Sequence, residues 1–378
     1  MKMRAAVLHR QGQPRPYARS RPLVIESVDL EPPGADEVLI EIRAAGLCHS
    51  DLSSIEGVRK RSLPTSIGHE AAGIVREVGD NVSEVGVGAH AVLSFVSPCG
   101  GCECCQQGRP NLCATHWNAR NSGTLLSGEK RLSLNGEPLN HFSGISAFAE
   151  YAVVSRHAVI PIDADIPMEV AALFGCAVMT GVGAVVNTAA VPAGASVAVV
   201  GLGGVGLSAL LGALVCGADP VVAIDVNAEK LALANALGAT HIVDARDGGA
   251  EEKILALTRG GVEYAFEMAG AVAAMQTAYR ITRRGGTTVS AGLPHHQHEF
   301  SIPLSEMVSD ERCVKGSYMG SCVPKRDVPR YLSLFRRGRL PVDRLKSGEI
   351  GFQSLNEGFD RLAAGEAVRQ VLLPHALA

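Results

Sequence analysis

A glycine-rich run between two apolar segments constrains the fold of this chain more than any other feature. The valine-rich residues 197–200 lead into Gly-Leu-Gly-Gly-Val-Gly at 201–206, and an apolar stretch then continues to Gly217. This order predicts a buried strand, a tight turn and a helix. Asp225 ends the next apolar run, 19 residues after Gly206. Glycines in such a unit let the backbone approach a pyrophosphate at the helix N-terminus, and the acidic residue binds ribose hydroxyls. The predicted dinucleotide site consists of Gly201, Gly203, Gly204, Val205, Gly206 and Asp225.

Asp225 also predicts which dinucleotide is bound. Its carboxylate would repel the 2′-phosphate of NADP, and residues 226–230 contain no arginine to bind one. The pattern therefore favours NAD. The uncharged stretch 195–218 is long enough to cross a bilayer, but its glycine turn and the acidic end of the following strand favour a nucleotide site over a membrane span.

Strand-like and helix-like patterns alternate around this turn. Apolar runs at 241–245, 262–268 and 287–294 predict further buried strands, and residues 250–259 and 271–283 have helical patterns between them. Such alternation predicts an α/β fold with a doubly wound parallel sheet. We expect this domain to span residues 178–317.

The first part of the chain has a different pattern, with short β-like runs interrupted by glycine and proline. Within it, Cys99, Cys102, Cys105 and Cys113 follow the spacing C-x2-C-x2-C-x7-C. Four thiolates complete a tetrahedral zinc shell and leave no position for a substrate, so we predict a structural zinc site. Cys104 does not fit the spacing, and we expect it to point away from the metal.

A second set of metal-ligating residue types is scattered along the chain. Cys48 lies in Gly-Leu-Cys-His-Ser-Asp, His69 in Gly-His-Glu-Ala-Ala-Gly, and Cys176 in Phe-Gly-Cys-Ala. Two thiolates and a neutral imidazole would balance the charge of one Zn²⁺ and leave its fourth position open, as a catalytic zinc requires. Spacing alone does not link these three residues, because long stretches of chain separate them.

Composition disfavours several classes of function. The 378 residues are 47% hydrophobic and 19% charged, which allows more than one folded domain. The formal net charge is −3 and the cations are spread along the chain, so we expect neither nucleic-acid nor membrane binding. The N-terminal residues lack the apolar core of a signal peptide. We therefore expect a cytoplasmic protein whose ten cysteines are thiols and metal ligands.

Together these motifs resemble the zinc-dependent medium-chain alcohol dehydrogenases, particularly the long, dimeric liver-type and glutathione-dependent formaldehyde dehydrogenase forms. The resemblance covers essentially the whole chain, including Gly-Leu-Cys-His-Ser-Asp, the four-cysteine lobe, residues 141–154 and Gly-Leu-Gly-Gly-Val-Gly-Leu-Ser. It implies a β-rich, GroES-like catalytic domain made of residues 1–177 and 318–378, with the NAD-binding Rossmann domain inserted between them. It also implies a homodimer.

The resemblance further implies roles for individual residues. Zinc ligands would be Cys48, His69 and Cys176, while Ser50 would take the proton of an alcohol whose carbon passes hydride to NAD. Around the zinc, the implied orienting residues are Asp51 and Glu70. Beyond the glycine turn, the implied cofactor contacts are His49, Thr180, Lys230, Leu293 and Arg369. The implied substrate pocket consists of Phe95, Val96, Trp117 and Phe142.

Two departures from the family pattern bear on function. Many long-type members carry a histidine five residues after the first zinc cysteine, but this chain has Ser53 there, which would leave water to carry the proton out. Glutathione-dependent members carry an arginine four residues after the last structural cysteine, where it receives the substrate carboxylate. Here that residue is Trp117, and Arg120 follows three positions later.

Three functions remain open from the sequence. The first is NAD-dependent oxidation of primary alcohols, with an apolar or aromatic body favoured by the aromatic residues at 95, 117 and 142. The second is oxidation of S-(hydroxymethyl)glutathione, which a basic pocket around Arg120 would support. The third is a non-catalytic zinc- and nucleotide-binding protein, which the intact set of zinc ligands disfavours.

Overall fold

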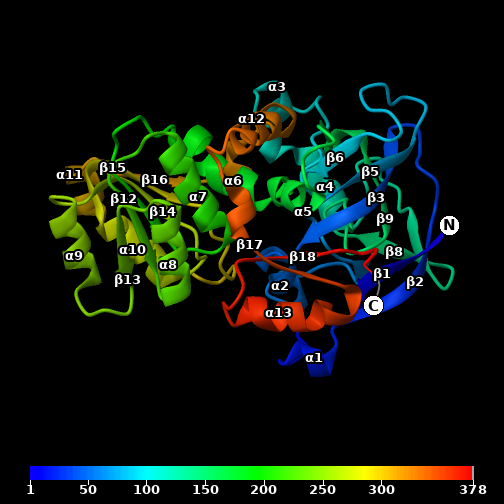
Figure 1. The fold of residues 1–378 in the computed structure, drawn as a ribbon, viewed down its shortest axis with the longest axis horizontal. Coiled ribbons are helices and arrows are strands. Elements are labelled where there is room, and N and C mark those ends of the chain that lie inside the picture. The colour runs from blue at the N-terminus through cyan, green and yellow to red at the C-terminus, as the bar shows by residue number, and fades with distance from the viewer. Residues whose placement is uncertain (377–378) are drawn as a thin grey trace. The chain divides into compact units, whose positions relative to one another are not determined.

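The computed structural model describes residues 1–376, which divide into two compact units (Figure 1). Unit 1 comprises Met1–Cys176, Val323–Arg330 and the chain from Lys346 onward, and unit 2 comprises Ala177–Cys322 and Tyr331–Leu345. This division differs from the predicted one, which returned the chain to the catalytic domain at residue 318. The 3₁₀ turn Met319–Ser321 packs on helix α6 (Ala177–Gly183), and Val342–Leu345 packs on α7 (Gly204–Val215), so both segments belong to unit 2.

Unit 1 is built from two β structures. Its strands are β1 (Lys2–Leu8), β2 (Leu23–Leu30), β3 (Glu37–Gly46), β4 (Thr65–Ser66), β5 (Ala71–Val78), β6 (His90–Leu93), β7 (Leu132–Leu134), β8 (Glu137–His141), β9 (Tyr151–Ser155), β10 (Val159–Ile162), β17 (Lys346–Ile350) and β18 (Arg369–Leu372). A closed barrel has the order β1-β2-β7-β8-β4. A seven-stranded sheet has the order β10-β6-β5-β3-β18-β17, with β9 also paired to β3.

Strand β3 organises the core of unit 1. Val38, Ile40 and Ile42 are fully buried, and they belong to one cluster with Phe148 and Phe359. Each buried side chain of this size contributes roughly 1.5–3 kcal/mol to stability. Strand β18 pairs antiparallel with the end of β3, so segments far apart in the sequence build one sheet.

Short helices surround these strands. They are α1 (Tyr17–Ser20), α2 (His49–Ile55), α3 (Glu103–Gln106), α4 (Ala114–Ser122), α5 (Met168–Ala171) and α13 (Leu355–Ala363). Helix α12 (Pro324–Arg336) begins in unit 1 and ends in unit 2. Helix α2 begins directly after Cys48, one of the predicted zinc ligands.

Unit 2 is an α/β sandwich, which confirms the predicted fold class. Its strands are β11 (Val197–Val200), β12 (Val221–Asp225), β13 (His241–Asp244), β14 (Val262–Glu267), β15 (Thr282–Ser290) and β16 (Cys313–Gly316). Its remaining helices are α8 (Ala228–Leu237), α9 (Ala250–Leu257), α10 (Val272–Arg280) and α11 (Leu304–Ser309). All strands pair in parallel in the order β13-β12-β11-β14-β15-β16. The strand order reverses direction between β11 and β14, which is where such sheets bind dinucleotides.

The uncharged stretch 195–218 folds as β11, the glycine turn and α7, as the strand-turn-helix interpretation predicts. Within residues 1–376, no single helix is both long and apolar enough to cross a membrane. Two consecutive helical segments, Met168–Gly175 and Ala177–Ala189, are long and apolar enough only when they are counted together. This result rests on length and composition alone.

Candidate active site

The three residues predicted to bind the catalytic zinc come together in unit 1. Their ligand atoms all lie within 4.8 Å of one another, and Cys48, His69 and Cys176 are at most 6% exposed. Gly175 lets the backbone pass close to β6 just before Cys176. A side chain at residue 175 would collide with the carbonyl oxygen of Leu93 in β6. Two buried sulfurs and one imidazole fit a zinc ion that keeps its fourth position open.

Asp51 holds two of these ligands in place. One carboxylate oxygen accepts a hydrogen bond from His69 Nδ1 at 2.9 Å, and the other accepts the backbone N–H of Cys48 at 3.2 Å. Because Nδ1 is engaged, Nε2 of His69 is left to bind a metal. Asp51 is the third residue of α2 and completes a capping box with Cys48. The same contacts therefore start the helix and orient the metal ligands.

Glu70 and Arg369 form a buried ion pair beside this cluster. Arg369 lies on β18 and is 4% exposed, its Nη1 is 3.4 Å from a carboxylate oxygen of Glu70, and it donates to the carbonyl of Leu47 at 3.2 Å. Gly46 makes room for this arrangement, since a Cβ there would collide with the Glu70 carboxylate. The predicted contact of Arg369 with the cofactor pyrophosphate stays a prediction.

Burial and neighbouring groups shift the pKa values of this cluster. Burial raises the pKa of Glu70 to about 7. The hydrogen bond with Cys176 lowers the pKa of Cys48 well below its usual value, although burial opposes this, and the same bond raises the pKa of Cys176. Burial disfavours a charged His69, yet the Asp51 carboxylate raises its pKa to about 10. These shifts favour a thiolate at Cys48, and cation binding would displace protons from the other two ligands.

Aromatic rings cover the imidazole of the cluster. The ring of Phe95 meets His69 edge-on with centroids 5.7 Å apart, and the ring of Phe142 is tilted against it at 5.8 Å. Both phenylalanines are at least nine-tenths buried, and Val96 is fully buried. The structure therefore places Phe95 and Phe142 beside the predicted zinc site.

Two other predicted residues are more accessible. Ser50, in the first turn of α2, is half-buried and accepts a hydrogen bond from Nη1 of Arg59 at 3.4 Å. Trp117, predicted as a pocket wall, is 50% exposed on α4, with the Arg120 Cζ 5.1 Å from the centre of its ring. The Trp117 side chain is therefore accessible to solvent, and its contact with substrate stays a prediction.

The four predicted structural cysteines also converge. The sulfur atoms of Cys99, Cys102, Cys105 and Cys113 lie within 4.8 Å of one another, while Cys104 is not one of this group. Backbone N–H groups point at the sulfurs, for example from residue 102 to Cys99 at 3.3 Å and from residue 99 to Cys113 at 3.3 Å. These amides offset the negative charge of four thiolates, so the lobe fits a closed zinc site.

The pKa values of the lobe follow from the same contacts. Burial opposes ionisation of Cys99, but hydrogen bonds from Thr115 and from the backbone of Cys102 and Gly101 lower its pKa to about 6. Burial and the neighbouring Cys102 raise the pKa of Cys105 to about 12. These pKa values favour a thiolate at Cys99, whereas Cys105 keeps its proton until a cation binds.

The glycine turn of unit 2 forms a cradle at the N-terminus of α7. Gly206 packs so closely on Gly201 that a side chain at residue 206 would collide with the Gly201 carbonyl oxygen. Beside it, a Cβ at Gly203 would meet nothing within 4 Å, so space for a ligand remains above the turn. Asp225 accepts the backbone N–H of Leu202 at 2.6 Å, which fixes its carboxylate against the turn. This cradle fits the pyrophosphate and ribose of a dinucleotide.

Comparison with known proteins decides the family. Residues 34–164 match the alcohol dehydrogenase GroES-like domain, and residues 204–337 match the zinc-binding dehydrogenase domain. The chain is 37% identical to alcohol dehydrogenase class-3 of Drosophila melanogaster, covering 94% of this chain and 95% of that protein. It is 35% identical to S-(hydroxymethyl)glutathione dehydrogenase of Paracoccus denitrificans, covering 99% and 100%. The chain belongs to the zinc-dependent alcohol dehydrogenase family.

A solved structure agrees with this assignment. Benzyl alcohol dehydrogenase of Acinetobacter calcoaceticus superimposes with a TM-score of 0.92 at 30% identity, covering 99% of each chain. The family uses NAD and two zinc ions, and the two clusters of this dehydrogenase fit the catalytic and structural zinc sites. Family members act on small molecules.

The remaining predicted cofactor residues of the dehydrogenase lie in both units. His49 is exposed at the start of α2 in unit 1. In unit 2, Thr180 is buried on α6, Lys230 is half-buried on α8, and Leu293 is 52% exposed after β15. The contacts of these four residues with NAD stay predictions.

Sequence reasoning missed two arginines beside the site. Arg59 contacts Ser50, and the Cζ of Arg61 lies 4.8 Å from the centre of the Phe142 ring. The signal that could have found them is the run Arg-Lys-Arg at 59–61, which follows the zinc-ligand motif by only a few residues.

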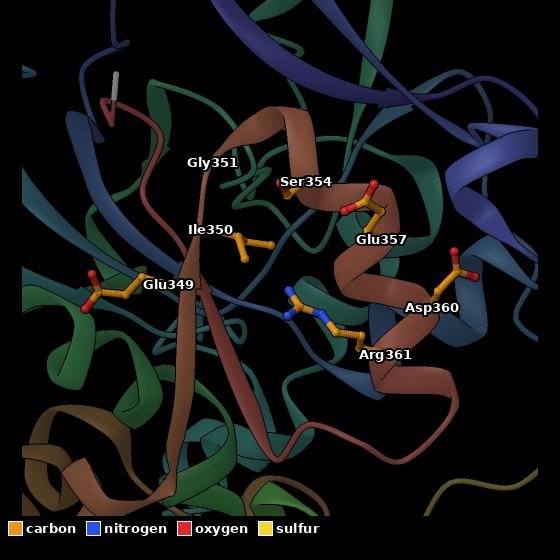
Figure 2. Close-up of a pocket in the computed structure, with 7 residues that line it drawn as sticks. All are labelled: Glu349, Ile350, Gly351, Ser354, Glu357, Asp360 and Arg361. Atoms are coloured by element: carbon orange, nitrogen blue, oxygen red, sulfur yellow. The ribbon is translucent and has the colours of Figure 1, made fainter. Parts of the chain in front are cut away.

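A separate hollow of about 570 Å³ lies between β17 and α13 in unit 1 (Figure 2). Its lining consists of Glu349, Ile350, Gly351, Ser354, Glu357, Asp360 and Arg361. The Asp360 carboxylate accepts two backbone N–H groups of α1, from Tyr17 at 2.7 Å and Ala18 at 2.9 Å. This acid therefore supports the packing of α1 on α13, and the predicted site residues lie elsewhere.

Proposed function

We propose that this dehydrogenase oxidises primary alcohols with an apolar or aromatic body to aldehydes, and catalyses the reverse reduction. One observation carries the proposal. The buried cluster of Cys48, His69 and Cys176 is covered by the rings of Phe95 and Phe142, so an alcohol bound there would lie against apolar, aromatic side chains. The similarity to a benzyl alcohol dehydrogenase supports this substrate class.

Several side chains of unit 1 would have separate roles in the reaction. Bound zinc supplies a Lewis acid that favours an ionised alcohol, and bound NAD supplies the hydride acceptor. Ser50 Oγ would take the hydroxyl proton of the alcohol. Asp51 keeps His69 in the orientation that exposes Nε2. Ser53 Oγ donates to the carbonyl of His49 at 2.8 Å, so this hydroxyl is engaged within α2, and water would carry the proton onward.

The proposal is tested with the zinc-loaded enzyme, NAD and a panel of alcohols. We expect kcat/KM for benzyl alcohol and hexanol to exceed that for ethanol by roughly tenfold or more, because each buried methylene adds about 0.8 kcal/mol. NADH formation at saturating NAD measures each rate. Oxidation of none of these alcohols would contradict the proposed function, and a preference for ethanol would contradict the apolar substrate class.

A second candidate is oxidation of S-(hydroxymethyl)glutathione. The name of the Paracoccus denitrificans relative favours it, and so does the position of Arg120 on α4 beside Trp117. The same panel includes this adduct as a substrate. A kcat/KM for the adduct above those of all simple alcohols would establish the second candidate in place of the first.

We infer that NAD is preferred over NADP because Asp225 is fixed at the end of β12, where its charge would oppose a 2′-phosphate. Asp225→Ala is expected to lower the ratio of kcat/KM for NAD to that for NADP by about tenfold, or about 1.4 kcal/mol. Steady-state assays with both cofactors measure this ratio. Glu252→Gln, on the exposed side of α9, is the control for loss of one negative charge. An unchanged ratio in Asp225→Ala would contradict this role.

A homodimer is also proposed. Strand β16 is the edge of the parallel sheet, and Val314 on it is 40% exposed. Leu304 and Val308 on the preceding helix α11 are 69% and 66% exposed. An open strand edge beside exposed apolar residues suits pairing with a second copy. Light scattering of the purified enzyme tests this, and a monomer mass at all concentrations would contradict it.

A further inference from the structure

The loop after α2 presents consecutive cations, Arg59, Lys60 and Arg61, from a fixed backbone. Gln11 holds this loop in place. Its Nε2 donates to the carbonyl oxygens of Ser54 and Arg59 at 2.6 and 2.7 Å, and its Oε1 accepts the backbone N–H of Arg61 at 3.3 Å. The backbone that carries the two arginines is therefore fixed relative to α2, which begins directly after Cys48.

The two arginine side chains reach residues of the proposed site. Arg59 Nη1 donates to Ser50 Oγ at 3.4 Å, and Arg61 Cζ lies 4.8 Å from the centre of the Phe142 ring. The Phe142 ring in turn lies 5.8 Å from the ring of His69. Each guanidinium group is therefore in contact with a side chain that we place next to the reacting alcohol.

Arg120 brings a third cation to the same region. It projects from α4 and, with Arg61, lines a small hollow of about 10 Å³ whose walls also include His141 and Phe142. All three arginines are half-buried, so water screens their charges less than at a fully exposed position.

We propose that the alcohol substrate of this dehydrogenase carries a carboxylate, and that Arg59 and Arg61 bind this carboxylate while Arg120 adds positive charge beside them. The inference rests on the proposed function, since it takes the alcohol to be oxidised at the Cys48–His69–Cys176 cluster. A guanidinium group presents paired N–H donors that match the two oxygens of a carboxylate, and such charged pairs are stronger than neutral hydrogen bonds. Phe142 would contact the apolar part of the substrate between its hydroxyl and its carboxylate.

The test compares a carboxylate substrate with its own neutral ester. The zinc-loaded enzyme is assayed with NAD and 4-(hydroxymethyl)benzoate or its methyl ester, and with 6-hydroxyhexanoate or its methyl ester. We expect kcat/KM to be at least about tenfold higher for each acid than for its ester. Added salt should lower kcat/KM for the acid more than for the ester. Equal or faster oxidation of the esters would overturn this inference while leaving the proposed function in place.

Variants of the loop then identify the residue responsible. Arg61→Gln should bring the acid-to-ester ratio toward one, whereas Arg61→Lys keeps the charge without the fork of donors and should retain part of the preference. Lys60→Gln removes the exposed cation between the two arginines and should leave the ratio unchanged. Zinc content shows whether each variant keeps its metal sites. An equal loss of preference in Lys60→Gln and Arg61→Gln would overturn specific binding by Arg61.

S-(hydroxymethyl)glutathione provides a third comparison because it carries its own carboxylates. A preference for this adduct that disappears in Arg61→Gln would support carboxylate binding by the loop. A preference that survives in Arg61→Gln would overturn it. Failure of the enzyme to oxidise any acid, ester or adduct would overturn the proposed function and this inference together, which distinguishes that failure from a simple preference for esters.

Discussion

Cys176→Ser is expected to lower kcat/KM for the preferred alcohol roughly a thousand-fold. The Sγ of Cys176 lies within 4.8 Å of the ligand atoms of Cys48 and His69, and serine is a poor replacement for a thiolate on zinc. A metal Lewis acid supplies several kcal/mol of transition-state stabilisation, and each 1.36 kcal/mol corresponds to tenfold in rate. Steady-state assays measure the loss, and metal analysis should show that the catalytic zinc is lost while the structural zinc remains.

The fold and cofactor binding should survive this change. Cys176 is the last residue of the first segment of unit 1, whereas the glycine cradle lies wholly in unit 2. NADH binding, followed by fluorescence, should therefore change little in Cys176→Ser. Cys216→Ser, at the end of α7, is the matched control and should keep full activity. Normal turnover by Cys176→Ser would remove Cys176 from the proposed zinc site.

Cys102→Ser is expected to lower the melting temperature by about 10 °C. Loss of a structural metal ligand removes several kcal/mol of stability, and each kcal/mol is worth roughly 2–4 °C in a domain of this size. The Sγ of Cys102 lies 3.5 Å from that of Cys105 and 3.8 Å from that of Cys113, so its loss opens the shell. Cys113 also caps α4 through the N–H of His116, and destabilisation should spread to that helix.

Cys104→Ser provides the control within the same lobe. Cys104 lies on α3 between Cys102 and Cys105 and is outside the group of converging sulfurs. We expect its melting curve, measured by calorimetry, to match that of the unchanged enzyme, and zinc analysis to show no loss of metal. An unchanged melting curve for Cys102→Ser, or equal losses in the two variants, would contradict a structural zinc in this lobe.

The sequence predicts unit 2 well because its signals are local. The glycine turn, the valine-rich strand before it and the acid at the end of the next strand all lie within about thirty residues, and the parallel sheet is confirmed. One predicted helix–strand boundary in this unit was clearly wrong. The helical pattern 271–283 ends in the structure at Arg280, and strand β15 begins at Thr282, earlier than the apolar run at 287. Its polar beginning joins the sheet through the pairing of Thr282 with Val262 on β14, which hydrophobicity does not reveal.

The proposed active site was harder to predict because its residues are far apart in sequence. Cys48 and Cys176 are 128 positions apart, and only the family resemblance linked them before the structure showed that they converge. The pairing of Glu70 with Arg369 depends on β18 lying next to β3, which no local pattern specifies. The arginines of the loop after α2 were missed for a similar reason, since their contacts with Ser50 and Phe142 depend on how the loop folds back.

The order in which the chain is synthesised has a consequence for unit 1. Strand β18 pairs Val371 with Gly46 and Leu372 with Ala45, so a strand synthesised much later than β3 completes the sheet that contains β3. The strands of unit 2 emerge without such a gap, and this unit can fold while the chain is still growing. Until β18 has been synthesised, Glu70 lacks the Arg369 cation that accompanies it in the finished sheet. A nascent chain that does not yet include β18 would therefore have a formed nucleotide unit and an incompletely assembled catalytic one.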